Sequence, residues 1–326
     1  MNRRGFVLTL GILALSYAHL VGAQQPKILP RLGILSARST GTLEIFDAFR
    51  QGLRDHGYAE GKNIFIEYRF AEEKYNRLPS LMAELMSFKP DVIFTHTTPG
   101  VLAAKRATKT IPIVIGAAAD LVEQGIVASL ANPGGNITGL SFVSLELDQK
   151  RLELLKETIP KISRVAVLVN PGNPLWKNYP HSMRAVARKL KLELQRFEAR
   201  NVEELNAAFS TMSKMRLEAV LAVSDTVFGN YRNQIRDLGL IHRLPVMFDK
   251  KEFAESGGFV ASGVDTSAMF RRAAFYIDKL VKGTPPENLP IERPMRPVLA
   301  INLKTASALG INIPPEFLQR ADEVIT

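Results

Sequence analysis

The 326-residue sequence predicts an α/β protein made of two doubly wound parallel-sheet lobes. Short β-branched runs alternate with segments of helical periodicity, and this order is typical of parallel sheets covered by helices on both faces. The alternation breaks near residues 140–147 and then starts again. It implies roughly ten strands, which is many for one sheet, so the break divides the chain into two similar halves.

The first half alternates strands and helices from its start. The strands are short apolar runs at 31–35, 64–68, 92–94 and 111–115. The helices carry apolar residues three and four positions apart, at 45–53, 78–86, 99–108 and 122–131. Residues that end helices support these bounds. Gly57 suits a left-handed cap after the first helix, Pro90 follows the second, and the turn sequence 132–135 ends the last.

The second half repeats the pattern and then adds segments that one lobe does not need. Its strands are expected at 165–169, 219–223 and 245–248, with helices at 176–190, 203–215 and 229–239. There follow a strand at 258–261, a long helix at 269–281, a proline-rich extended segment at 285–297, a strand at 298–302 and, after a turn at 309–315, a closing helix. These last segments fit a chain that visits one lobe, then the other, and crosses back twice.

Residues 1–23 have the three parts of a cleavable signal peptide. Arg3 and Arg4 supply positive charge, residues 6–21 are uncharged and apolar, and Ala23 is a small residue at the cleavage point. The apolar run is about 16 residues long, whereas a membrane span needs roughly 20. We therefore expect export to the periplasm by the general secretory or the twin-arginine route. An uncleaved anchor is the alternative, and it would leave the remaining chain on the same side.

The sequence has no cysteine. Disulfides, cysteine-bound zinc or iron–sulfur sites and a cysteine nucleophile are therefore excluded, and so is a lipid anchor on cysteine.

The formal net charge of +10 arises from 42 basic and 32 acidic residues. Such a balance can indicate nucleic-acid binding, but the basic residues are spread singly along the predicted helices, which favours solvated helix faces. An attraction to an anionic membrane surface stays open.

Motifs of catalysis are missing from the sequence. The five histidines are scattered without metal-binding spacing, and neither a Gly-x-Ser-x-Gly elbow nor a phosphate-binding Gly-x-x-x-x-Gly-Lys loop occurs. The glycine-rich run 133–139 follows a predicted helix and precedes a strand, which is the wrong order for a dinucleotide loop. We expect a protein that is not an enzyme and that has no cofactor and no metal site.

Polar residues stand just after six predicted strands, where open α/β sheets bind ligands beside helix N-termini. The candidate ligand-binding residues are Ser36, Thr97, Thr98, Asp120, Asn170, Asn173, Asp225, Thr226 and Asp249. Each has an alternative role, because Ser, Thr, Asn and Asp are also the preferred helix caps. Trp176, at the same end of the second half, either stacks on a ligand or packs against its own helix.

Several blocks resemble the bacterial ABC-transporter substrate-binding proteins of the tryptophan or aromatic amino-acid type. The matching blocks are 49–63, 66–69, 103–108, 111–113, 130–139, 150–156, 271–274, 301–306 and 320–324. Together they extend over essentially the whole chain after the signal peptide.

The resemblance implies a type I periplasmic-binding-protein fold, in which three hinge crossings join the lobes. Lobe 1 would comprise 28–142 plus 264–296, and lobe 2 would comprise 143–263 plus 297–326. The crossings would fall near 141–144, 262–265 and 295–299. The protein would be the extracytoplasmic solute-binding component of an ABC uptake transporter. Its ligand would be a small carboxylate-bearing molecule, an amino acid or an aromatic or related acid, held between the lobes.

The partners follow from the same resemblance. The closed protein would meet an ABC permease in the inner membrane, and a periplasmic sensing module that signals to a membrane partner is the alternative. We expect a monomer that binds no nucleic acid, because a repressor of this fold would carry a helix-turn-helix where the signal peptide stands.

The resemblance also implies roles for the candidate residues. Ser36, Thr97 and Thr98 would hold the ligand carboxylate. Asn170, Asn173 and Asp225 would face them from the second lobe. Asp225 would be the better candidate for contact with an ammonium group, and Asp249 would be a secondary candidate. The sequence departs from relatives at 119–121, which reads Ala-Asp-Leu where they have Gly-Asp-Pro, and at 262–265, which reads Ser-Gly-Val-Asp where they have Tyr-Gly-Pro-Asn. These departures leave the identity of the ligand open.

Overall fold

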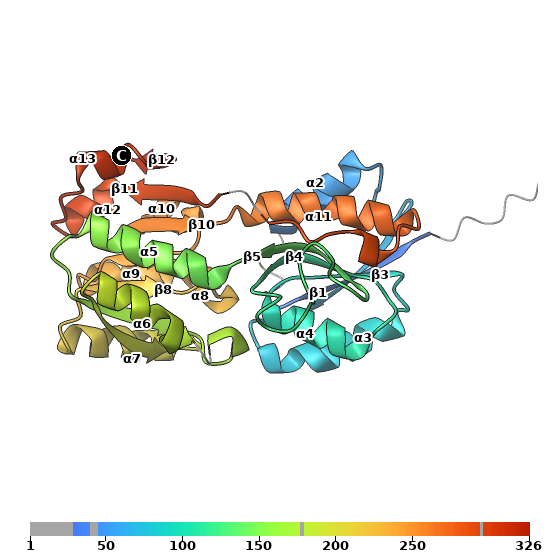
Figure 1. Ribbon diagram of the computed structural model, residues 1–326, viewed down its shortest axis with the longest axis horizontal. Coiled ribbons are helices and arrows are strands. Elements are labelled where there is room, and N and C mark those ends of the chain that lie inside the picture. The colour runs from blue at the N-terminus through green and yellow to red at the C-terminus, as the bar shows by residue number, and fades with distance from the viewer. Residues whose placement is uncertain (1–28, 40–44, 177–178, 294–295) are drawn as a thin grey trace, which may run out of the picture.

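The computed structural model has two α/β lobes arranged end to end, each built around its own sheet (Figure 1). It describes residues 29–39, 45–176, 179–293 and 296–326. The predicted signal peptide, 1–23, lies outside the described residues. Among the helices in the described ranges, none has the length and apolar character that a membrane crossing requires.

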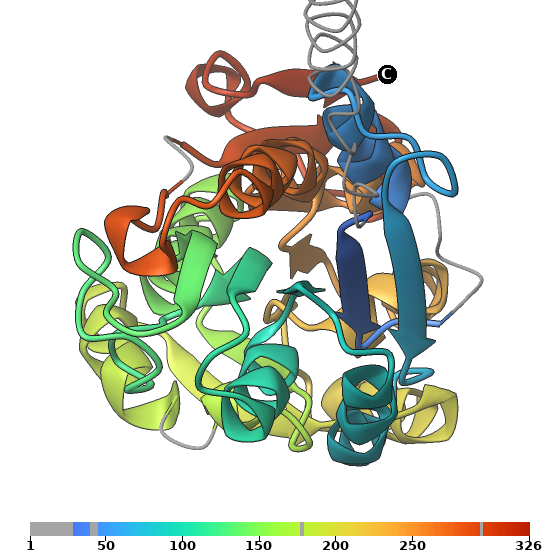
Figure 2. The same cartoon turned by 90° about the vertical axis from the view of Figure 1, so that its right-hand side faces the viewer.

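The first sheet has the strand order β2-β1-β3-β4-β5, and all its neighbouring pairs are parallel. Its strands are β1 (Arg31–Ser36), β2 (Phe65–Phe70), β3 (Val92–Thr95), β4 (Ile113–Ala119) and β5 (Ile137–Phe142). Side chains alternate between the two faces along a strand. Ile34 accordingly joins the apolar cluster under α2 (Ile45–Asp55) and α11 (Thr266–Val281), and Leu35 joins the cluster under α3 (Leu78–Ser87) and α4 (Thr98–Ala107). Figure 2 shows these two helical layers on opposite faces of the sheet.

The second sheet has the order β12-β11-β10-β9-β8-β6-β7 and one antiparallel pair, β10 with β11. Its strands are β6 (Arg164–Val169), β7 (Glu193–Glu198), β8 (Ala219–Ala222), β9 (Val246–Phe248), β10 (Val260–Gly263), β11 (Val298–Asn302) and β12 (Glu323–Ile325). Its helices are α5 (Ser144–Thr158), α6 (Tyr179–Lys189), α7 (Val202–Lys214), α8 (Thr226–Asn230), α9 (Arg232–Ile241), α10 (Lys251–Glu255), α12 (Leu303–Ala308) and α13 (Pro315–Leu318). One continuous apolar core surrounds this sheet.

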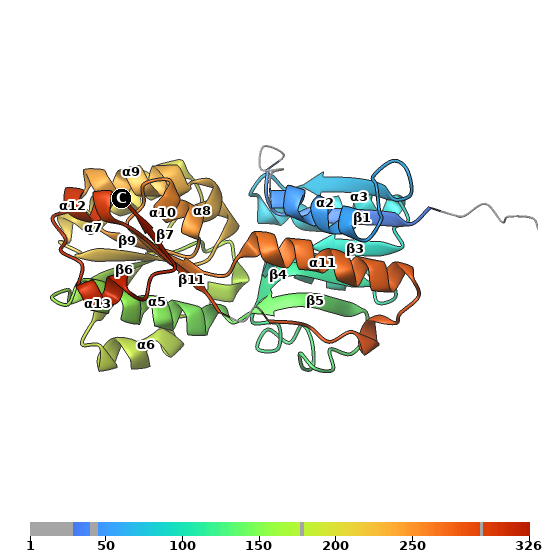
Figure 3. The same cartoon turned by 90° about the horizontal axis from the view of Figure 1, so that it is seen from above.

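The described chain passes between the two sheets at three places, which Figure 3 shows together near the middle of the molecule. The first passage runs from β5 into α5, and the second from β10 into α11. The third lies between a short 3-10 helix, Pro286–Asn288, and β11, and its residues 294–295 are outside the described ranges. Helix α11 returns to the first lobe, where Phe270 packs against Phe46 with their ring centroids 5.6 Å apart. The predicted fold of two lobes with three crossings is confirmed.

The predicted helix at 122–131 is wrong, because this segment consists of turns and bends. Gly125 has a left-handed φ of 63°, which interrupts a helix. Hydrogen bonds to other parts of the lobe replace the helical ones: Lys105 donates to the carbonyls of Gly125 and Ile126, and the Leu130 carbonyl accepts from the Ile291 amide.

Two further bounds differ from the prediction. Strand β4 runs on to Ala119 instead of ending at 115. Its small residues leave room for aromatic packing, since a Cβ on Gly116 would lie 2.4 Å from a ring atom of Phe94. The helix predicted at 229–239 is two helices, α8 and α9, which meet at Tyr231.

Candidate ligand-binding site

A cavity of about 60 Å³ lies where the strand ends of the two lobes face each other. The first lobe lines it with residues that follow β1 and β3 and with the end of β4. The second lobe contributes residues that follow β6, β8 and β9. Its polar and charged lining residues are Arg38, Tyr75, His96, Thr97, Thr98, Ser144, Asn173, Ser224, Asp225, Thr226, Asp249, Lys250 and Thr266.

The N-terminus of α4 borders the cavity through Thr97 and Thr98. Thr97 has a φ of 65°, a costly value for a β-branched residue. In this conformation its hydroxyl caps the helix by accepting from the Gly100 amide at 3.4 Å, while its own amide donates to the Ala117 carbonyl at 2.8 Å. The Thr98 hydroxyl donates to the Ala119 carbonyl at 3.2 Å. What this end offers a ligand is thus the partial positive charge of a helix N-terminus.

Asp225 is buried at the N-terminus of α8 and accepts four hydrogen bonds. Its Oδ1 accepts from the Tyr75 hydroxyl at 3.1 Å, the Asn170 amide group at 3.0 Å and the Val227 backbone at 2.9 Å. Its Oδ2 accepts from the Asn173 amide group at 2.9 Å. Burial raises the pKa of Asp225, and these donors oppose the shift. Four bonds match the usual capacity of a carboxylate, so Asp225 mainly fixes the side chains around it.

Ser36 and His96 form a buried pair behind the cavity wall. The Ser36 hydroxyl lies 2.9 Å from Nε2 of His96, and it also accepts from the Arg38 amide at 3.1 Å. Of the two, His96 borders the cavity. Burial, together with the charges of Arg38 and Lys250, lowers the pKa of His96 well below its usual value. The imidazole is therefore neutral at physiological pH.

Asp120 is placed at a lobe crossing and is not part of the cavity lining. Its Oδ1 accepts from the Ser144 amide at 3.0 Å, at the start of α5. Burial, with the negative charges of Glu123 and Glu146, raises the pKa of Asp120 to about 6. Asn170 also lies outside the lining and reaches the cavity through its bond to Asp225.

Trp176 packs in the core of the second lobe and is 1% exposed. It does not line the cavity. Of its two possible roles, the structure shows packing within its own lobe.

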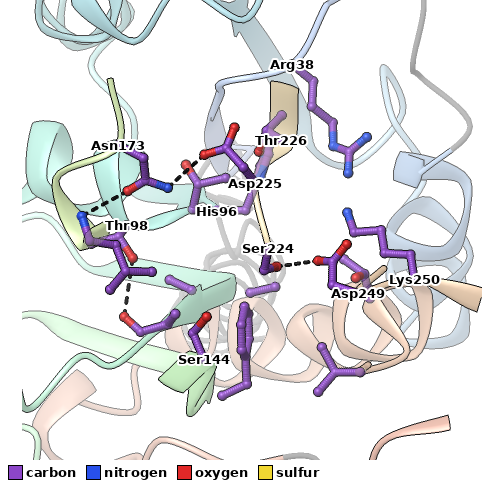
Figure 4. A pocket seen from close by; sticks show the side chains of 18 of the residues that line it. Arg38, His96, Thr98, Ser144, Asn173, Ser224, Asp225, Thr226, Asp249 and Lys250 are labelled. Atoms are coloured by element: carbon purple, nitrogen blue, oxygen red, sulfur yellow. Dashed lines mark hydrogen bonds between the residues drawn. The ribbon is translucent and has the colours of Figure 1, made fainter. Parts of the chain in front are cut away.

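The cavity contains two cations that sequence reasoning missed. Arg38 follows β1 in the first lobe, and Lys250 follows β9 in the second. Burial lowers the pKa of each of them. Asp249 lies between these cations and the rest of the cavity, and its Oδ2 accepts a hydrogen bond from the Ser224 hydroxyl (Figure 4). Within the described residues its Oδ1 is buried without a hydrogen-bond partner. No sequence signal marks these cations, because isolated charged residues in loops are mostly solvated.

Comparisons with known proteins agree with this geometry. The family described as ABC transporter substrate binding protein matches residues 35–325. A tyrosine-binding protein of Clostridioides difficile is 28% identical over 264 residues, which cover 81% of this chain and 75% of that protein. A conserved domain protein from Vibrio cholerae has a TM-score of 0.82 at 27% identity, over 90% of this chain and 99% of its own.

A further solved structure is an ABC domain from Streptococcus pneumonia in complex with L-Trp. It has a TM-score of 0.83 at 23% identity, over 91% of this chain and 100% of its own. Substrate-binding proteins of ABC transporters are not enzymes; they bind small molecules outside the cytoplasm and work with a permease. With nearly all of its described residues matched, this chain belongs to the ABC transporter substrate-binding protein family.

Proposed function

We propose that the protein is the solute-binding component of an ABC uptake transporter and that it holds a small carboxylate-bearing ligand, an amino acid or an aromatic or related acid. The observation that carries this proposal is the cavity between the lobes, where the N-terminus of α4 meets polar residues of the second lobe. A helix N-terminus attracts carboxylates. The tyrosine-binding relative and the L-Trp complex support the amino-acid class.

The roles of the candidate residues follow from their bonds. We propose that Thr97 and Thr98 receive the carboxylate and that Asn173 and Thr226 contact the ligand from the second lobe. Asp249 is the better partner for an ammonium group, because its Oδ1 is free within the described residues. Asp225, with four bonds already made, holds Asn170 and Asn173 in place. Ser36 supports the wall through His96.

The two lobes are proposed to close on the ligand as bodies that comprise 28–142 plus 264–296 and 143–263 plus 297–326. Support for these bounds comes from the separate cores and sheets. Asp120 and Ser144 then belong to a hinge. We further propose a monomer without nucleic-acid partners. Cleavage after Ala23 and the lack of cysteine would leave it unattached in the periplasm, whichever export route it takes.

A thermal-shift screen of the purified protein tests the ligand class. Candidate ligands are the L-amino acids, aromatic acids and other small carboxylates, with sugars and divalent metals for comparison. A ligand at 100 times its dissociation constant stabilises the folded state by about 2.7 kcal/mol. The proposal predicts a clear rise in Tm with a carboxylate. A rise with sugars or metals alone contradicts it.

Asp249→Asn tests the proposed ammonium partner. The variant should weaken the binding of an α-amino acid by about tenfold or more and leave the corresponding acid without the amino group unaffected, because a buried charge pair is lost in the first case alone. Asp237→Asn is the control, since Asp237 is exposed on α9. Equal affinities of wild type and Asp249→Asn for the amino acid would contradict this role.

A further inference from the structure

The end of the cavity away from Thr98 is lined by the two cations Arg38 and Lys250. Figure 4 shows their charged groups pointing toward one another, Arg38 from the first lobe and Lys250 from the second. Arg232 adds a third positive charge to the field that acts on Arg38. Three cations thus act at this end of the cavity, and the carboxylates of Asp249 and Glu252 oppose part of their charge.

Neither charged group has a carboxylate partner among the described residues. Arg38 is 9% exposed, and its Nε is buried without a hydrogen-bond partner. Within the described ranges its one side-chain bond goes from Nη1 to the amide oxygen of Asn230, at the long distance of 3.4 Å. Lys250 makes no ion pair within 4.0 Å in the described part of the chain. The carboxylates of Asp249 and Glu252 act on both cations from farther away, and that of Asp225 acts on Lys250.

Arg38 is nearly buried and Lys250 is half-buried, so these two facing cations repel each other and have lost part of their hydration. Buried charges in proteins are as a rule paired, because an unpaired one is costly. Arg38 comes from one lobe and Lys250 from the other, and within the described residues no carboxylate lies close enough to form an ion pair with either. A ligand that places an anionic group between Arg38 and Lys250 converts this repulsion into two attractive interactions.

The cavity has separate places for two anionic groups. The first is the N-terminus of α4, where the hydroxyl of Ser144 is also buried with no partner in the described structure. The second is the Arg38–Lys250 pair.

We infer that the ligand is a dicarboxylic acid, with or without an α-amino group, whose second carboxylate lies between Arg38 and Lys250. This inference rests on the proposed function and narrows its ligand class. It sets this chain apart from relatives whose names state tyrosine or L-Trp.

Matched pairs of ligands test it, each pair differing in the second carboxylate alone. Calorimetric titration of the purified protein compares L-glutamate with L-glutamine, L-aspartate with L-asparagine, and glutarate with its monoamide. At least one dicarboxylate should bind tenfold or more tightly than its amide. The inference is wrong if no dicarboxylate of the panel binds, or if L-tryptophan or L-tyrosine binds more tightly than all of them. Binding of a monocarboxylate alone would leave the proposed function standing, whereas binding of neither class would contradict both.

Variants locate the second carboxylate. Lys250→Met should reduce the affinity for the best dicarboxylate by about thirtyfold or more and change that of its amide by less than threefold. Arg38→Gln should also weaken the dicarboxylate more than its amide, on top of a loss common to both ligands, because it removes the bond to Asn230 between the lobes. Lys251→Met is the matched control, because Lys251 is the next residue and pairs with Glu255 and Glu323 outside the cavity. Equal losses of affinity for the dicarboxylate and for its amide would mean that the two cations support the fold and do not bind the second carboxylate.

Discussion

Asp225 joins donors from both lobes at one buried carboxylate. Tyr75 reaches it from the first lobe, and Asn170, Asn173 and the Val227 amide from the second. Asp225→Ala leaves these donors without their acceptor, and each buried unsatisfied donor costs about 1–3 kcal/mol unless water enters. We expect the free energy of unfolding to fall by about 2–4 kcal/mol in urea denaturation. Asp237→Ala, on the exposed face of α9, should change it by less than about 0.5 kcal/mol. A stable Asp225→Ala variant that has lost ligand binding would instead give Asp225 a direct role.

Asp120 makes stability depend on pH at the hinge. Its pKa of about 6 in the folded state exceeds the ordinary value of 3.8 because burial disfavours the carboxylate. Between these pH values the folded chain keeps a proton that the unfolded chain has lost. The contribution of Asp120 therefore favours the folded state fully below about pH 4 and is lost as the pH rises through about 6.

Asp120→Asn should remove this dependence. The free energy of unfolding of the wild type, relative to that of the variant, should decrease by up to about 3 kcal/mol between pH 4 and pH 7. Urea denaturation of both proteins at several pH values measures the difference. Parallel pH profiles would show that the hydrogen bond from Ser144 offsets the burial of Asp120.

At the scale of elements, strand β10 determines where the loop after β9 lies. Gly263 ends β10, and a Cβ at this position would lie 1.7 Å from the Asp249 carbonyl oxygen. Gly263→Ala should displace Asp249 and Lys250, lowering the free energy of unfolding by about 1–3 kcal/mol and weakening ligand binding. Gly229→Ala is a control for stability alone: its new Cβ would lie 3.5 Å from Lys250 Nζ and 4.0 Å from Arg38 Nη2, so it fits without a clash but lies at the site. Denaturation checks both variants, and calorimetric titration compares Gly263→Ala with the wild type. Unchanged affinity in Gly263→Ala would mean that the loop adjusts without moving the site.

The elements that sequence patterns predicted are those with apolar runs. Strands β1, β3, β6 and β8 are fully buried or nearly so, and their β-branched residues mark them. The edge strands β7 and β12 were missed, because their largely exposed or half-buried sequences contain no such run. The helix predicted at 122–131 failed because tertiary hydrogen bonds to Lys105 and Ile291 outweigh its local periodicity.

The sequence predicted those residues of the site that directly follow the ends of strands. Polar residues after β3, β6, β8 and β9 do meet at one cavity, as the rule for parallel sheets leads one to expect. Asp120 and Asn170 obey the same rule, yet they act on neighbouring residues instead. Arg38 and Lys250 were not predictable, because they come from different lobes and face each other only in the folded chain, and no local pattern encodes that approach.

At the scale of the whole molecule, direct contacts between the lobes stabilise the closed arrangement. Asn230 of α8 accepts from Arg38 and donates to Glu73, both of the first lobe, and Tyr75 donates to Asp225. Glu73 and Tyr75 lie in the segment that follows β2, where Glu72 and Glu73 have left-handed φ values of 51° and 59°. The backbone that brings these side chains to the second lobe is therefore strained. A ligand that contacts both lobes also stabilises the closed arrangement, so lobe opening and ligand binding are linked equilibria.

Asn230→Ala should therefore shift the protein without ligand toward an open form. Two hydrogen bonds between the lobes are lost, each of about 0.5–1.5 kcal/mol, while the core of neither lobe is touched. In small-angle X-ray scattering the radius of gyration of the variant should exceed that of the wild type without ligand and match it at saturating ligand. Because the closed form is then less populated, the apparent affinity should fall by about tenfold. Asn206→Ala, which removes a bond within α7 alone, should leave both quantities unchanged. Equal radii of gyration and equal affinities in Asn230→Ala and Asn206→Ala would mean that Asn230 does not control closure. The ratio of open to closed forms would then depend on the hinge around Asp120.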